Sequence, residues 1–201
     1  GTSGPVKCKR DPEEEWQPNQ MAFYKSCQAL GFNSAKDHND PDSTGVGPVP
    51  FNTIDGVRQS TWLTYLKPVM KRGNLTIIPE AFVISLNFNG TKTESVTIIR
   101  QNQTTTIEAS EVIVSGGAIG SPQLLMLSGI GDAAQLKNHG IAVVKNLPGV
   151  GKNLRDHPQA QVVWKTKENR SQDPDPYKRV QVGLRYTASN SNLRNDMFLQ
   201  P

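Results

Sequence analysis

The residues with the clearest chemical potential are Ser115, Gly116 and Gly117, which form a run of small side chains. The β-branched residues 112–114 before them are typical of a parallel strand covered on both faces. Ser121 fits a helix N-cap, and Pro122 fits the first helical position because its φ is fixed and it has no amide hydrogen to leave unpaired. A helix start presents free N–H groups and the positive end of the helix dipole, so the turn is predicted to bind an anion.

A second interpretation of the same turn is purely structural. Gly116 and Gly117 could serve only to let a strand and a helix pack tightly. The helix is expected to bury one face formed by Leu124, Leu125, Leu127 and Ser128. The glycines alone do not decide between these interpretations, so the longer string around them has to be considered.

Two strings in this part of the chain carry a specific resemblance. Ser121-Pro122-Gln123, the leucine-rich helix and Ser128-Gly129-Ile130-Gly131 resemble the second signature of the glucose-methanol-choline (GMC) family of flavin oxidoreductases. Further on, Asn146-Leu147-Pro148-Gly149-Val150-Gly151-Lys152-Asn153-Leu154-Arg155-Asp156-His157-Pro158 is similar to the loop that follows in that family. The resemblance extends more loosely over nearly the whole chain.

The resemblance implies FAD as the cofactor and a set of residues near it. Val83 matches a position that gives backbone contacts to the adenine of FAD. The loop carrying Asn153, Asp156 and His157 is implied to lie close to the flavin, together with the turn at Ser115, Gly116 and Gly117. For Asp156 and His157 the alternative role is to brace their own loop through hydrogen bonds.

The implied fold is α/β and incomplete. It comprises part of a Rossmann-like FAD-binding domain with an inserted antiparallel β-meander, and part of an α+β substrate domain with an antiparallel sheet. Residues 1–70 would form a covering loop and the start of the substrate domain, residues 71–157 part of the FAD-binding domain, and residues 158–201 a further part of the substrate domain.

Local patterns predict the elements of the first part. Asn19 is expected to cap a helix over residues 20–30 that Gly31 ends, with Leu30 on its buried face. Residues 33–56 are rich in turn-forming residues throughout and predict a long loop. His38 in this loop is expected to be a surface or loop-bracing histidine and not a catalytic one. A helix with an aromatic inner face is predicted after Ser60 and ends at Pro68.

The later part is predicted to alternate between strands and a short helix. Strands are expected over residues 75–78, 82–88, 96–99, 105–109, 141–144, 161–165 and 180–186. The first four would form an antiparallel meander leading into the strand at 112–114. Asp132 is expected to cap a helix over residues 133–138, with Gly140 as its C-terminal stop.

The resemblance implies that further residues of the FAD site and the catalytic residues lie outside this sequence. The Gly-x-Gly-x-x-Gly turn that follows a first strand and holds the FAD pyrophosphate is missing, and Gly129-Ile130-Gly131 imitates its spacing only after a helix. The family's catalytic histidine also lies beyond the matched segment, so no catalytic residue is assigned. The resemblance predicts the central fragment of an enzyme that oxidises an alcohol by hydride transfer to flavin N5, itself inactive.

Two alternatives compete with this interpretation. A truncated, non-catalytic relative could keep the middle of the fold as a binding or scaffold module. A Ser-His-Asp hydrolase using Ser121 or Ser128 is disfavoured because the sequence has no Gly-x-Ser-x-Gly elbow.

Composition excludes several other classes. The net charge of +4 comes from scattered basic residues without aromatic interleaving, which argues against nucleic-acid binding. Cys8 and Cys27 read as ordinary thiols, no metal site is predicted, and no apolar run approaches the roughly 20 residues of a membrane span. The absence of a signal sequence favours a cytoplasmic protein, whereas glycosylation-type triplets such as Asn74-Leu75-Thr76 leave secretion open. The alcohol, the electron acceptor and the oligomeric state are not readable.

Overall fold

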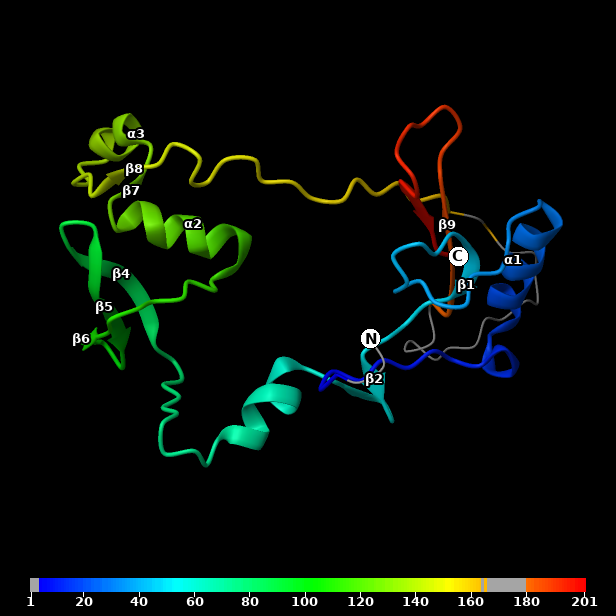
Figure 1. Ribbon diagram of the computed structural model, residues 1–201, viewed down its shortest axis with the longest axis horizontal. Helices are drawn as coiled ribbons and strands as arrows, with labels where there is room; N and C mark the ends of the chain where they lie inside the picture. The colour runs from blue at the N-terminus through cyan, green and yellow to red at the C-terminus, as the bar shows by residue number, and fades with distance from the viewer. Residues whose placement is uncertain (1–3, 164, 166–179) are drawn as a thin grey trace. The chain divides into compact units, whose positions relative to one another are not determined.

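The computed structural model describes residues 4–163, 165 and 180–201. Its backbone contacts divide the chain into two compact units (Figure 1). Unit 1 consists of Gly1–Leu75 with Trp164–Pro201, and unit 2 consists of Thr76–Val163. The division lies close to the predicted boundaries after residues 70 and 157, while the roles predicted for the pieces stay predictions.

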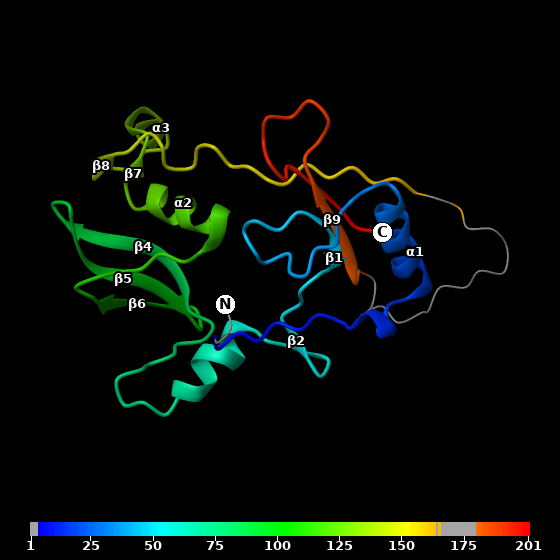
Figure 2. The ribbon, with the colours of Figure 1, turned by 45° about the vertical axis from the view of Figure 1, so that its right-hand side comes forward.

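A three-stranded antiparallel sheet organises unit 1. β1 (Gly45–Pro48) pairs with β9 (Val182–Tyr186), which pairs on its other edge with β10 (Met197–Leu199). The ribbon views show β1 beside β9, with α1 (Pro18–Ala29) next to them (Figures 1 and 2). The predicted loop over residues 33–56 is therefore wrong at β1, because a partner far along the chain supplies the hydrogen bonds that make a strand.

Helix α1 starts two residues earlier than predicted and ends one residue earlier, at Ala29, with Gly31 as its predicted stop. Its N-cap is Gln17 and not Asn19, because Pro18 takes the first turn, where no amide hydrogen is needed. At the other end Gly31 adopts a φ of 89°, and the N–H of Phe32 donates to the carbonyl of Cys27 at 3.1 Å. This is a Schellman-type ending, which favours glycine. Leu30 lies past the end and is 78% exposed, so its predicted burial is wrong.

The core of unit 1 joins α1 to the sheet. Cys27, Val46, Val182 and Leu184 are buried, and aromatic side chains pack around them. Polar side chains reinforce this contact: the buried Gln20 Oε1 accepts hydrogen bonds from the N–H groups of Gln181 and Val182 at 3.0 and 3.1 Å. These bonds tie the helix to the first residues of the β9 region, which are far away in the sequence.

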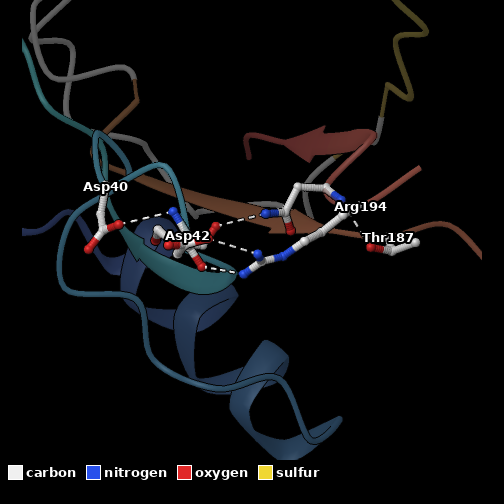
Figure 3. Close-up of polar contacts among 6 residues, drawn as sticks. Asp40, Asp42, Thr187 and Arg194 are labelled. Carbon is white, nitrogen blue, oxygen red and sulfur yellow. Dashed lines mark hydrogen bonds and ion pairs between the residues drawn. The ribbon is translucent and has the colours of Figure 1, made fainter. Parts of the chain in front are cut away.

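The connection between β9 and β10 is fixed to the loop before β1 (Figure 3). Arg194 donates from Nη1 to Oδ1 of Asp42 at 2.9 Å and from Nη2 to the Asp42 carbonyl at 2.7 Å. The carboxylate of Asp40 accepts from the N–H of Asp42, and the N–H of Asn195 donates to Oγ1 of Thr187. These bonds order two surface segments that have little apolar surface to bury.

The remaining elements of unit 1 are short. They are η1 (Glu13–Glu15), the hairpin of β2 (Thr53–Ile54) and β3 (Val57–Arg58), the π-helical turn η2 (Trp62–Leu66) and the 3₁₀ turn η3 (Lys67–Val69). The helical segment predicted after Ser60 is present, but it continues through Pro68 because proline is tolerated in the first turn of η3.

Unit 2 contains an antiparallel meander. β4 (Phe82–Asn89), β5 (Lys92–Arg100) and β6 (Gln103–Glu108) pair in the order β4-β5-β6 (Figure 2). The tight turns use residues that accept positive φ: Gly90 in the first, and Gln101 and Asn102 in the second. The predicted strand over residues 75–78 does not form.

Helices and a small parallel pair complete unit 2. α2 (Gly117–Leu127) packs against β4, and β7 (Ile130–Gly131) pairs in parallel with β8 (Lys145–Asn146). α3 (Ala133–Asn138) begins as predicted, because the Asp132 carboxylate accepts from the N–H groups of Ala134 and Gln135 at 3.0 Å. The strand predicted over residues 141–144 is displaced to β8, where Ile130 and Gly131 offer a partner.

The predicted parallel strand over residues 112–114 is wrong. These residues are extended but unpaired, and Val114 is only half-buried. Their β-branched composition suits a pleated surface, but a strand also requires a neighbour to complete its ladder, and the described part of unit 2 offers none here. Residues 161–163 of the predicted strand 161–165 are likewise unpaired and exposed, and residue 164 lies outside the described residues.

The predicted start of α2 is also wrong. The N-cap is Gly116 and not Ser121, and Pro122 lies inside the helix. Ala118 and Ile119 extend the helix towards the glycines, and Pro122 then omits only the one hydrogen bond that its missing N–H would have made. The predicted buried face is confirmed at Ser128, which is 8% exposed, whereas Leu124 and Leu125 are only half-buried and the prediction is wrong for Leu127, which is 54% exposed. The chain as a whole mixes helices and strands, in agreement with the α/β class.

Candidate functional site

A pocket of about 750 Å³ lies between β4, residues 112–116 and α2; we call it the strand-edge pocket. Three of the predicted cofactor-binding residues line it: Val83, Ser115 and Gly116. Most of its other walls are apolar and include Phe82, Leu86, Val112, Leu124 and Leu127. The pocket can therefore accept a flat, weakly polar group on an apolar surface.

The backbone of Val83 faces the free edge of the sheet. The N–H of Ala109 donates to the carbonyl of Glu94, so the even-numbered residues of β5 direct their backbone groups towards β6. Ile98 is one of these residues and pairs with Val83 across β4 and β5. Val83 therefore directs its own N–H and C=O away from β5, as Leu86 does when its N–H donates to Ser128. A ligand at this edge can be recognised through one donor and one acceptor.

Of the two glycines in the turn, only Gly117 has open space where a side chain would be. A side chain on Gly117, at a φ of 78°, would meet no atom within 4 Å. A Cβ on Gly116 would stand 3.1 Å from the Ser121 nitrogen and 3.2 Å from the Gly120 carbonyl carbon. A side chain at Gly116 would therefore crowd the start of α2, and Gly117 faces open space without lining the strand-edge pocket.

Asn153 lies in a different hollow. A second pocket of about 560 Å³, the helix-flank pocket, is formed by α2 residues including Pro122 and Met126 and by residues 151–155. Asn153 takes a φ of 57°, a conformation that asparagine tolerates, and Lys152 and Arg155 bring two positive charges to the same wall. Gln123 lines both pockets, so the two hollows lie on either side of it.

Asp156 and His157 line neither of these pockets. Their side chains are essentially fully exposed, and the Asp156 carboxylate accepts from the N–H of His157 at 2.7 Å. This geometry corresponds to the bracing role that was the alternative for these two residues. Their proximity to a flavin stays a prediction.

His38 belongs to the framework of unit 1. It is 4% exposed, and its Nε2 lies 3.2 Å from the carbonyl oxygen of Gly47 and 3.0 Å from that of Gly183. Burial lowers the pKa of His38, which keeps the ring neutral so that a single N–H is shared by the two carbonyls. The histidine joins β1 to β9, as the bracing interpretation of the sequence predicts.

Ser128 does not line the strand-edge pocket but bonds to two residues that do, a role that the sequence did not predict. Ser128 was expected on a buried helix face, but its Oγ also accepts a hydrogen bond from the N–H of Leu86 at 2.8 Å and donates to the Leu124 carbonyl at 2.7 Å. The only local signal is a serine directly after a leucine-rich helix, and its β4 partner could not be identified from spacing.

Within residues 4–163, 165 and 180–201, no group of three or more His, Cys, Asp or Glu side chains could hold a metal ion. In the same part of the chain, no helix combines the length and the apolarity that crossing a bilayer requires.

Comparison with known proteins defines the class of this chain. The family model described as GMC oxidoreductase matches residues 3–159, so the chain belongs to the GMC oxidoreductase family, as its strings suggested. FAD, the predicted cofactor, is confirmed by this family and by an FAD-dependent neighbour from Chaetomium thermophilum, which has a TM-score of 0.68 at 29% identity over 74% of this chain and 26% of its own.

Individual known proteins are also similar to this chain. The chain is 40% identical over 188 residues to the oxygen-dependent choline dehydrogenase of Staphylococcus haemolyticus, covering 92% of this chain and 33% of that protein. The pyridoxine 4-oxidase from Mesorbium loti matches with a TM-score of 0.78 at 25% identity, over 100% of this chain and 38% of its own. The chain thus spans about a third of the length of the curated relatives it matches.

The residues of the strand-edge pocket fit the adenosine part of FAD. An adenine ring needs apolar walls and a few hydrogen-bonding groups, and the pocket offers both, with the outward backbone of Val83 at its edge. Gly116 lines the pocket without a side chain that would fill it. The exposed Asp156 and His157 do not add to this fit.

Proposed function

We propose that this chain forms the central part of a longer FAD-dependent enzyme that oxidises an alcohol. Bound FAD would accept the hydride of the carbinol carbon at N5. The proposal is supported by the family, by the choline dehydrogenase relatives and by their greater length, since the chain covers 33% of the first of them. We further propose that unit 2 belongs to the FAD-binding domain and unit 1 to the substrate domain.

Within this proposal the chain binds and orients the cofactor. The N–H and C=O of Val83 would hydrogen-bond to the adenine edge, and the apolar walls of the pocket would exclude water from its faces. Ser115 and Gly116 would lie against the neighbouring sugar or phosphate, where the start of α2 favours negative charge. None of these residues would move a proton of the substrate.

A single observation carries the proposal. Val83 and Ser115–Gly116, which are distant in the sequence, line the same pocket in unit 2. The second pocket adds Lys152 and Arg155 beside Asn153, a cationic wall that would suit another anionic part of a dinucleotide. Asp156 and His157 would contribute only if their loop packs differently in the complete protein.

The test compares the complete protein with the isolated chain. The complete protein is expected to bind FAD, and its flavin absorbance band is expected to bleach when a suitable alcohol is added. The 201-residue chain alone is expected neither to retain FAD tightly nor to turn over an alcohol. A complete protein without affinity for FAD would contradict the proposed cofactor role, and bleaching by the isolated chain would contradict its proposed inactivity.

A further inference from the structure

The two walls of the strand-edge pocket are joined by one buried hydroxyl group. Ser128 is 8% exposed and follows the last residue of α2. Its Oγ donates to the Leu124 carbonyl, one turn back in the helix, and accepts from the N–H of Leu86 on the outer edge of β4. The hydroxyl therefore uses both its donor and its acceptor to join helix and strand.

Both partners of this serine line the pocket. Leu86 belongs to the β4 wall, which also presents Val83, and Leu124 belongs to the α2 wall, which also presents Gly120. Among the hydrogen bonds of the described residues, the bond from Leu86 to Ser128 is the one that joins β4 to the end of α2. The rest of the contact between these walls is apolar and non-directional, so this bond fixes their register.

The end of α2 is anchored on its other side as well. Gly129 takes a φ of 85°, and its carbonyl accepts from the N–H groups of Val144 and Lys145 at 2.8 and 3.1 Å. A Cβ at Gly129 would collide with the Ala142 carbonyl, so only glycine permits this approach. The helix is thus held at its C-terminal end, whereas its N-terminal residues 117–119 are exposed.

From this geometry we infer that Ser128 is a positioning residue for the adenine-binding pocket. It acts through Leu86 and α2, by setting the distance between the outward backbone of Val83 and the glycines at the helix start. The inference rests on the proposed function, because it takes the occupant of the pocket to be the adenosine part of FAD. Ser128 itself is not required to touch the cofactor.

The experiment separates positioning from general stability by comparing two flavins. FMN lacks the adenosine part of FAD, so a pocket for adenine affects FAD binding alone. In the complete protein, Ser128→Ala is expected to raise the Kd for FAD about tenfold, because a buried N–H loses its acceptor and the pocket walls shift. The Kd for FMN is expected to stay within about twofold of the wild-type value.

A matched control removes a serine hydroxyl from the sheet. Ser95 on β5 is also 8% exposed, and its Oγ accepts from Nδ2 of Asn87, but it does not line the strand-edge pocket. Ser95→Ala is expected to leave the affinities for both flavins unchanged. If Ser128→Ala does not accumulate as a folded protein, Ser128→Cys, which is similar in size but a poorer hydrogen-bonding group, is expected to show the same selective loss for FAD to a smaller extent.

Each outcome has a definite meaning. Equal losses of FAD and FMN affinity, or no loss for either, would overturn the positioning role of Ser128. A wild-type protein that binds FAD no more tightly than FMN would contradict the adenine pocket itself, and therefore the proposed function along with this inference.

Discussion

Different kinds of interaction stabilise the inside of each of the two units of this chain. In unit 1, the short strands β1 and β9 are far apart in sequence, and side chains such as Gln20, His38 and Arg194 bond to distant backbone groups. In unit 2, the sheet is a meander of adjacent strands joined by tight turns, and side chains such as Ile113 and Ile119 are largely exposed. Unit 1 thus depends on long-range polar bonds, whereas unit 2 is locally organised and leaves apolar surface available for a ligand or a neighbour.

Gln20→Ala is expected to have the largest effect, because it tests the polar bonds of unit 1 directly. The substitution would leave the N–H groups of Gln181 and Val182 without the acceptor they share, in a buried site. Each buried unsatisfied donor costs about 1–3 kcal/mol, so the free energy of unfolding should fall by about 3 kcal/mol. Urea denaturation followed by intrinsic fluorescence measures this change.

The matched control lies on the same helix. Gln28 is exposed, and its amide donates to Oγ of Ser34. Gln28→Ala should change the free energy of unfolding by no more than about 0.5 kcal/mol. Similar losses for the two variants would show that unit 1 does not depend on the buried amide.

His38 should make the free energy of unfolding of unit 1 depend on pH, an effect that unit 2 should lack. Burial lowers its pKa in the folded state, so its contribution to stability is fully present above the unfolded-state pKa of about 6.5 and is lost as the pH falls through the lower folded-state value. The free energy of unfolding should therefore decline below about pH 6.5, and His38→Phe should remove that decline. Exposed His139 serves as the control, since His139→Gln should preserve the decline; an unchanged slope in His38→Phe would assign the effect to other groups.

Arg194→Ala is expected to have the smallest effect. The Arg194 and Asp42 side chains are 60% and 82% exposed, so water and salt screen their attraction. The substitution should lower the free energy of unfolding by about 0.5 kcal/mol, and by less in high salt, relative to Arg72→Ala at another exposed position. A loss several times larger would mean that the contact in Figure 3 fixes the β9–β10 connection more firmly than its exposure suggests.

The same difference between the units explains what could be predicted from the sequence. The meander and the helix after Asp132 were predictable, because turn residues and a capping carboxylate act on neighbouring residues. Strand β1 was not, since its partner β9 lies at the other end of the chain. The strand predicted over residues 112–114 failed for the related reason that composition cannot supply a partner.

The candidate site was only partly predictable. The resemblance selected Val83, Ser115 and Gly116, and the structure places all three at one pocket. It did not separate them from Asn153, which lies in the helix-flank pocket, or from Asp156 and His157, which are exposed. The bond between Ser128 and Leu86 depends on how α2 packs on β4, and no pattern of local spacing contains that information.

We propose above all that the outer edge of β4 binds the adenine of FAD through the backbone of Val83. Val83→Pro removes an N–H that faces away from β5, which an edge strand tolerates, and Thr106→Pro removes the equivalent N–H on the opposite edge of the same sheet. Equilibrium titration of the complete protein with FAD should show about a tenfold higher Kd for Val83→Pro and an unchanged Kd for Thr106→Pro. Equal affinity in the two variants would contradict the claim.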